Sequence, residues 1–218
     1  MRTLVIDTAL GACTAAVCEG GRVLGLRSEI MARGHSERIG GFVRDAVVES
    51  GVGFAAIERV GVTIGPGSFT GLRVGLAFAL GLGQSLDRPV VGVSSLQSLA
   101  WSIEGGPQGA VASVIDARRG EVYLQTFADG DPIDGPRAAT IESATTTLAD
   151  MRQIWRWAGN GAVLVAADIE FVVTEPTALA LAALTERLDP TLHPARPLYL
   201  RAPDATPPTR LPGQARAV

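Results

Sequence analysis

The chain contains no lysine, so all nineteen of its basic residues are arginines. This absence excludes a Schiff-base lysine, a lysine general base and the phosphate-binding lysine of a Walker A loop. The net charge is -3 and the isoelectric point is about 5.4. Because a protein needs a basic surface to bind phosphate backbones, we expect that this chain does not hold nucleic acid by itself.

Cysteine is almost as scarce, with only Cys13 and Cys18 among 218 residues. Both lie in one predicted strand, and their odd separation places them on opposite faces, so they cannot pair with each other. Two reduced, buried thiols are typical of a cytosolic protein.

The two histidines, His35 and His193, restrict both catalytic and metal chemistry. Neither gives a Ser/His/Asp arrangement with consistent spacing, whether Ser36 or Ser68 is taken as the nucleophile, so a peptidase is the weakest interpretation. A single imidazole does not make a transition-metal site without further ligands. We therefore predict no metal site and no catalytic residue.

Long apolar runs are also missing. The longest apolar helix, residues 72–86, is shorter than the roughly 20 residues that a membrane span requires. Asp7 interrupts the apolar start of the chain before it reaches the length of a signal peptide. We expect a soluble cytoplasmic protein. With 47% hydrophobic and 19% charged residues, the chain can bury the core of one large domain or two small ones.

The first 104 residues predict the order β-β-β-α-β-α-β-α. Residues 3–6, 12–18 and 22–30 have the pattern of strands, and an acid, Asp7, closes the first of them. This start is unlike a Rossmann unit, whose first strand runs directly into a glycine-rich turn and a helix. The later elements are a helix at 36–50 with Ser36 as its cap and Gly51 at its end, strands at 60–64 and 89–93, and helices at 70–86 and from Ser94 or Ser95 to 103.

The second half carries weaker signals. Its predicted elements are paired strands at 110–116 and 121–127, a loop at 129–136, a weak helix at 143–157, a short strand at 162–166, a helix at 177–188 and a last strand at 197–201. Alternating spacing in Asp116, Arg118, Glu121 and Tyr123 favours an arginine–carboxylate network over a catalytic cluster. We predict one lobe at 1–104, a smaller lobe at 105–201 and a disordered tail at 202–218.

Residues 65–75, with the sequence GPGSFTGLRVG, form a glycine-rich turn that opens into a helix. Gly65 and Gly67 permit positive φ angles, and Ser68 or Thr70 can cap the helix. Such a junction suits an anion, and it equally suits the start of an interface helix. Thr70 stands where a GxGxxG fingerprint needs glycine, which weakens the nucleotide interpretation.

Two helices carry faces that we interpret as partner interfaces. Helix 70–86 has a nearly bare row of small residues beside a leucine row, so it must be covered on more than one side. Replacing Gly75 or Ala79 by a bulky charged residue is expected to break a complex and leave the monomer folded. The candidates are Ile39, Phe42, Val43, Ala46 and Val47 on helix 36–50, and Gly71, Leu72, Gly75, Leu76, Ala79 and Gly83 on helix 70–86.

Several segments together resemble the TsaB (YeaZ) family, a bacterial subunit that supports synthesis of threonylcarbamoyladenosine in tRNA. They are residues 5–8, 35–38, 65–75, 94–96, 115–123 and 197–201. The resemblance covers essentially the whole chain up to Arg201, and the run at 65–75 is its most specific part. It implies an α/β fold of the actin/Hsp70-like ATPase (ASKHA) type, with two lobes of mixed sheets and a reduced second lobe.

The resemblance also implies a function and partners. It implies a non-catalytic scaffold and dimerisation subunit that binds TsaD, the catalytic threonylcarbamoyltransferase, with TsaE in the wider complex and a homodimer when TsaD is absent. On this resemblance, tRNA is met only through the complex, ATP only at the complex junction, and no membrane takes part. TsaD has a His-x-x-x-His metal pair, whereas here His35 is followed four residues later by Ile39.

Asp7 and Thr8 keep one alternative open. In active members of the fold that the chain resembles, the acid that closes the first strand lies near the metal and phosphates. An ATPase or kinase-like phosphotransferase that uses Asp7 is therefore the second hypothesis. The interpretation we favour is a strand-end acid that hydrogen-bonds a turn.

Overall fold

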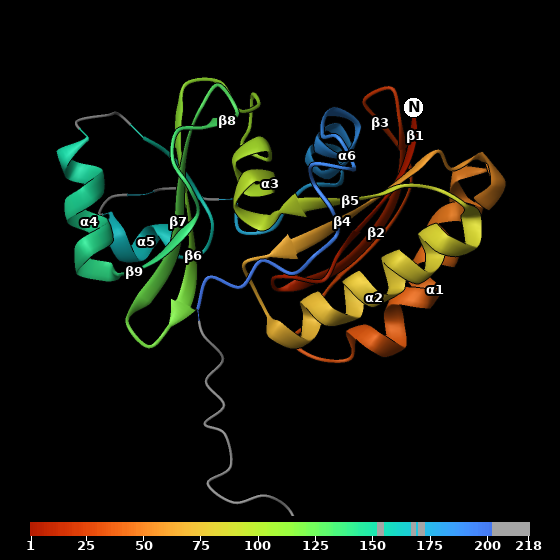
Figure 1. Ribbon diagram of the computed structural model, residues 1–218, viewed down its shortest axis with the longest axis horizontal. Coiled ribbons are helices and arrows are strands. Elements are labelled where there is room, and N and C mark those ends of the chain that lie inside the picture. The colour runs from red at the N-terminus through yellow and green to blue at the C-terminus, as the bar shows by residue number, and fades with distance from the viewer. Residues whose placement is uncertain (152–154, 167–168, 170–172, 202–218) are drawn as a thin grey trace, which may run out of the picture.

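The computed structural model describes residues 1–151, 155–166, 169 and 173–201. Two five-stranded sheets form its framework, and α3 (Ser95–Trp101) lies between them (Figure 1). Within the described ranges, no helix is long and apolar enough to cross a membrane.

The first sheet has the strand order β3-β2-β1-β4-β5. Its antiparallel part is β1 (Arg2–Asp7), β2 (Ala12–Glu19) and β3 (Arg22–Ile30), and its parallel part adds β4 (Arg59–Gly65) and β5 (Val90–Ser94). Helices α1 (His35–Ser50) and α2 (Phe69–Leu86) cover one face, and α6 (Ala178–Arg187) covers the other (Figure 1). A short 3-10 helix, η1 (Phe54–Ala56), precedes β4.

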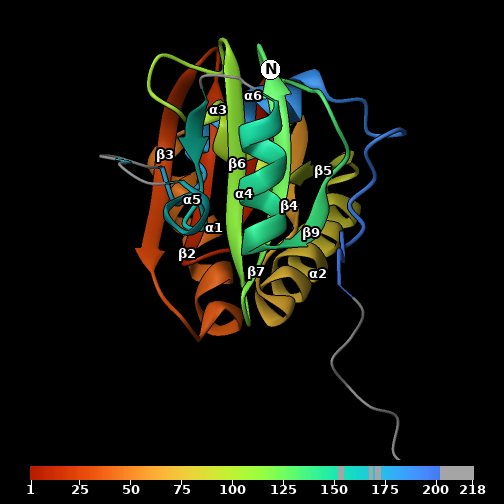
Figure 2. The same ribbon diagram turned by 90° about the vertical axis from the view of Figure 1, so that its left-hand side faces the viewer.

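The second sheet has the order β10-β6-β7-β8, with β9 paired to β7. Its strands are β6 (Ala110–Arg118), β7 (Glu121–Ala128), β8 (Asp131–Pro132), β9 (Arg137–Thr140) and β10 (Arg156–Ala158). Helices α4 (Ile141–Asp150) and α5 (Ala162–Val165) cover its outer face (Figure 2). The inner face packs on α3, so α3 is shared between the two sheets.

Covered faces explain why β1, β2, β4 and β5 are nearly continuous apolar runs, whereas the edge strand β3 is mostly exposed. Leu4 and Ile6 pack with α1 and α2, whereas Val5 packs with α6. Cys13 and Cys18 divide between the same two clusters, which confirms that they lie on opposite faces. Both are free, and burial raises the pKa of each thiol to about 11.

Two predicted elements of the second half are wrong, and a third, the weak helix, is too long. Residues 162–166 are a helix, α5, because a short apolar run does not distinguish helix from strand by itself. The weak helix at 143–157 ends at Asp150, and Arg156–Ala158 is a strand. Residues 197–201 form no strand, although the Leu198 amide donates to the Ile64 carbonyl at 2.8 Å.

The expected helix caps are partly right. Ser68 accepts a hydrogen bond from the Gly71 amide at 3.2 Å and so caps α2. Ser36 does not cap α1, which begins at His35 after Gly34 in the left-handed conformation. Gly65 has the positive φ expected of it, 105°. Gly67 is needed for a different reason, since a Cβ there would lie 2.2 Å from the Ala9 carbonyl oxygen.

The proposed division at residue 104 stays a prediction. Helix α6 falls in the range 105–201, yet it packs on the first sheet, so the chain returns to its starting lobe. The predicted tail at 202–218 lies outside the described residues.

The small-residue row of α2 faces the inside of the protein. A Cβ on Gly71 would lie 2.0 Å from the Thr8 carbonyl oxygen, and one on Gly75 would lie 2.4 Å from Thr8 Oγ1. A Cβ on Gly83 would lie 2.2 Å from a methyl group of Val90. The row therefore lets α2 approach its own sheet closely.

This packing corrects the predicted partner interface. All eleven candidates are buried against the chain's own core, because an apolar stripe serves the first sheet before any partner. They are Ile39, Phe42, Val43, Ala46, Val47, Gly71, Leu72, Gly75, Leu76, Ala79 and Gly83. The burial of Gly75 and Ala79 argues against the expectation that a bulky charge at either position leaves the monomer folded.

Replacing Gly75 by leucine should lower the free energy of unfolding by about 3 kcal/mol or more, because the new side chain has no space beside Thr8. The matched control is Gly81→Ala in the same helix, where nothing lies within 4 Å of a new Cβ. This control should be neutral or stabilising by about 0.5–1 kcal/mol. Urea unfolding followed by circular dichroism measures both, and equal stability of Gly75→Leu and the wild type would refute the packing.

Candidate functional site

A cavity of about 490 Å³ lies where the two sheets face each other, beyond the carboxyl end of β1. The β1–β2 turn, residues 30–32 and the start of the α2 turn form its wall on the first lobe. Polar side chains reach it mainly from the second lobe and the segment before α6: Asp116, Arg118, Tyr123, Asn160 and Glu175.

Asp7 closes β1 beside this cavity and is almost fully buried, with 1% of its surface exposed. Its Oδ1 accepts hydrogen bonds from the Ala9 amide at 2.9 Å and from Thr63 Oγ1 at 2.6 Å. Burial raises the pKa of Asp7, and these hydrogen bonds oppose that rise. The arrangement matches a strand-end acid that holds a turn.

Thr8 also bonds within the chain. Its hydroxyl donates to the Gly71 carbonyl at 2.7 Å, and this bond is buried. Thr8 thus fixes the first turn of α2 to the end of β1. The residues predicted as weak nucleotide candidates, Asp7 and Thr8, both direct their polar atoms to the chain itself.

Glu175 is a site residue that the sequence interpretation missed. Its two carboxylate oxygens accept from the Gly11 amide at 3.0 and 3.2 Å, and the Ala12 amide also stabilises it. Burial, with the nearby charge of Asp7, raises the pKa of Glu175 to about 7. No local signal marks this glutamate, because its partner is 164 residues away in the sequence.

The arginine–carboxylate network on β6 and β7 is confirmed. Arg118 pairs with Asp116 at 3.1 Å, and Arg201 pairs with Glu121. Asn160 accepts a hydrogen bond from the Asp116 amide at 2.9 Å, which ties the network to the turn after β10. Tyr123 is part of the cavity wall.

The histidines lie on different elements. His35 is buried at the start of α1, and within the described residues its Nε2 has no hydrogen-bond partner. His193 is exposed in the loop after α6. Across residues 1–151, 155–166, 169 and 173–201, no group of three or more His, Cys, Asp or Glu side chains is placed to hold a metal ion.

The backbone amides of the turn beside the cavity are already bonded within the chain. An anion site needs backbone amides that point into it, but those of Ala9 and Gly11 are bonded to the chain's own carboxylates. The Ser68 amide donates to the Ala9 carbonyl at 2.7 Å. Asp7 and Glu175 thus occupy the amides of Ala9 and Gly11 with acceptor groups, while Arg118 lines the same cavity from β6.

Glu175 makes the stability of the fold depend on pH. Its pKa in the folded chain, about 7, lies above the ordinary value of 4.5, so its contribution is present below about pH 4.5 and is lost as the pH rises through 7. Between pH 5 and 8 the wild type should lose about 1 kcal/mol more stability than Glu175→Gln, after allowance for solvent screening. Urea unfolding across this range measures the difference.

Glu142→Gln, at an exposed position on α4, is the matched control and should follow the wild type. A Glu175→Gln variant with the same pH dependence as the wild type would contradict the assigned burial of this carboxyl.

Comparison with known proteins identifies relatives over most of the chain. The family model described as TsaD, tRNA N6-adenosine threonylcarbamoyltransferase, matches residues 21–171. An uncharacterized protein of Mycobacterium bovis is 38% identical over 94% of this chain and 93% of its own length. The tRNA threonylcarbamoyladenosine biosynthesis protein TsaB of Escherichia coli is 39% identical over 58% of this chain and 55% of that protein.

Solved structures agree with these relatives. YeaZ from Pseudomonas aeruginosa superposes with a TM-score of 0.72 at 28% identity, covering 91% of this chain and 99% of that chain. The ethanolamine utilization protein EutJ of Carboxydothermus hydrogenoformans, at 11% identity and a TM-score of 0.50, shares the fold alone. The predicted two-lobed α/β fold of the ASKHA type is confirmed. The chain belongs to the TsaB (YeaZ) family, whose named members are proteins of tRNA threonylcarbamoyladenosine biosynthesis.

Proposed function

We propose that this chain is a non-catalytic subunit of the tRNA threonylcarbamoyladenosine synthesis complex that binds and supports the catalytic subunit TsaD. The observation that carries the proposal is the outer face of α1 and α2. These helices lie side by side over one face of the first sheet, with their outer sides uncovered within the described chain (Figure 1).

The outer face combines open glycines with exposed apolar side chains. A Cβ at Gly41 or Gly81 would meet nothing within 4 Å. Val48 is 73% exposed and Leu80 is 47% exposed. Glycines on a helix surface let another helix approach closely, and clustered apolar groups favour association.

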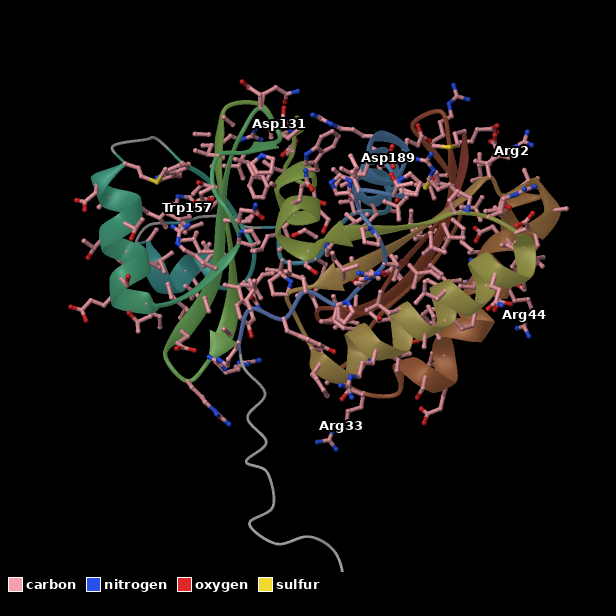
Figure 3. All side chains as sticks on the ribbon, viewed as in Figure 1. Arg2, Arg33, Arg44, Asp131, Trp157 and Asp189 are labelled. Carbon is pink, nitrogen blue, oxygen red and sulfur yellow. The ribbon has the colours of Figure 1, made fainter. Side chains whose placement is uncertain are left out.

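Charge on this face lies almost entirely on α1, while α2 carries only Arg73. The charged residues of α1 are Glu37, Arg38, Arg44, Asp45 and Glu49. Arg44 extends from α1 into solvent (Figure 3) and pairs with Asp45 of the same helix at 2.8 Å. The α2 side of the face, with one charge and small side chains, suits a protein partner, because burying unpaired charge is costly. In the absence of TsaD, the same face fits a second copy of this chain.

The other partners follow from the same assignment. TsaE belongs to the wider complex, and ATP is bound only at the complex junction. The cavity supports this division of labour, since the turn that faces it is occupied by Asp7 and Glu175.

The competing function is an ATPase or kinase-like phosphotransferase that uses Asp7. It needs Asp7 to face metal and phosphate, whereas Asp7 is buried and bonded to Ala9 and Thr63. These contacts favour the scaffold.

Introducing a bulky charge at Gly81 should disrupt the complex with TsaD and leave the monomer folded, because this position opens outward. A mixture of Gly81→Arg and TsaD should separate into two uncomplexed proteins in size-exclusion chromatography with light scattering. A mixture of the wild type and TsaD should elute as one complex. Thr146→Arg, at an exposed site on α4 of the second lobe, is the matched control and should preserve the complex. An intact complex with Gly81→Arg would refute this interface.

Titration calorimetry with magnesium and ATP separates the two functions. The isolated chain should show no binding at about millimolar ATP, a concentration at which affinities near -4 kcal/mol are detected. Metal-dependent ATP binding that is lost in Asp7→Asn would instead establish the phosphotransferase and overturn the scaffold proposal.

A further inference from the structure

An exposed aromatic cluster lies at the beginning of α2, toward the opposite end of that helix from Gly81. Phe69 is 49% exposed and Tyr199 is 45% exposed, with ring centroids 5.5 Å apart. The Arg73 guanidinium lies 3.8 Å from the centre of the Phe69 ring, and its Nε donates to the Tyr199 hydroxyl at 3.3 Å. We call these three residues the aromatic rim.

The rim is held in place by contacts that leave its rings open. The cap at Ser68 fixes the start of α2, where Phe69 lies. On the other side, the Leu198 amide donates to the Ile64 carbonyl, and Arg201 donates to the Ala117 carbonyl at 3.1 Å. The rings are therefore ordered without being buried. A ligand that binds them loses little further side-chain entropy, because the side chains are already fixed.

Arginines lie on the segments that flank the rim, although the chain as a whole has a net charge of -3. Arg201 reaches from the segment of Tyr199 to the β6–β7 turn, which carries Arg118 and Arg119. The Arg118 side chain is 82% exposed. Arg33 extends into solvent at the same lower edge of the molecule (Figure 3), next to Ala32, which lines one cavity with Ser68 and Arg118.

The combination of flat exposed groups and arginines points to a chemical class of partner. Bases of single-stranded RNA stack on aromatic rings and on guanidinium planes, and arginines contact the phosphates between them. A purely acidic peptide would use the arginines and leave the rings without a role. Asp116 and Glu121 are each paired with an arginine, which limits their repulsion of phosphate, and Glu175 lines the same cavity as Ser68.

We propose that the aromatic rim is a contact site for single-stranded RNA, with bases stacked on Tyr199 and on the Phe69–Arg73 pair. This goes beyond the scaffold function, in which only the assembled complex contacts tRNA. It does not depend on TsaD, because the rim belongs to this chain alone. The overall negative charge predicts weak binding that falls steeply with salt.

Fluorescence anisotropy of the full chain tests the site. The probes are a fluorescein-labelled oligoadenylate of about 12 nucleotides and an unmodified tRNA transcript, both at about 50 mM salt. Phe69→Ala and Tyr199→Ala should each weaken binding about tenfold, while Phe69→Tyr should retain it. Arg33→Ser should weaken binding and reduce the slope of log affinity against log salt by about 0.7.

The matched control is Arg22→Ser, which should bind as the wild type. Arg22 pairs across the sheet with Glu19, which pairs with Arg2, so it lies at the opposite end of the first sheet from Asp7 and the rim. Gly81→Arg should also retain RNA binding, which separates this proposal from the one for TsaD.

Three results would overturn the site. The first is no saturable RNA binding by the wild type, and the second is wild-type RNA affinity in both alanine variants. The third is an alanine variant that loses TsaD binding but keeps RNA binding, which would make the rim a protein-docking surface. If an alanine variant fails to fold by circular dichroism, ultraviolet crosslinking of wild type to the oligoadenylate decides. Crosslinks in peptides that contain Phe69 or Tyr199 support the site, and crosslinks confined to other peptides refute it.

Discussion

The close approach of α2 to the β1–β2 turn is the constraint on which the rest of the structure depends. Gly67, Gly71 and Gly75 occupy positions where any Cβ would collide with Ala9 or Thr8. The Thr8 hydroxyl and the Ser68 amide then bond across this contact. The glycine-rich run thus allows α2 to pack against the end of β1 at backbone distance. This packing explains the glycines without a ligand-binding turn.

This contact determines which backbone amides and which helix face remain free to bind a ligand or a partner. The turn beside the cavity is bonded by Asp7 and Glu175, so its amides are already taken by carboxylates of the same chain. The inner side of α2 is occupied by the sheet, and its outer side remains uncovered within the described residues. The open surface that the fold leaves for the proposed partner is therefore helical, while the turn beside its cavity is bonded to the chain's own acids.

The sequence predicted the framework because local patterns carry it. The strand and helix order of the first lobe, the opposite faces of Cys13 and Cys18, and the pairing of Asp116 with Arg118 follow from spacing within a few residues. The side of α2 that packs inward could not be predicted in this way. That helix is apolar most of the way round, so its sequence does not distinguish the face that meets the sheet from the face left open.

Long-range contacts account for most of the remaining differences. Glu175 acquires its role from Gly11, and Tyr199 acquires its role from Phe69, and neither pair has a signal in the local sequence. The failure at residues 162–166 has another cause, since four or five apolar residues fit a buried strand and a buried helix turn equally well.

Hydrogen–deuterium exchange of the chain with and without TsaD tests the central claim most directly. The account predicts slower exchange in α1 and α2 when TsaD is bound, with α4 on the second lobe unchanged. Unchanged exchange in α1 and α2 while TsaD is bound, or protection confined to the second lobe, would contradict it.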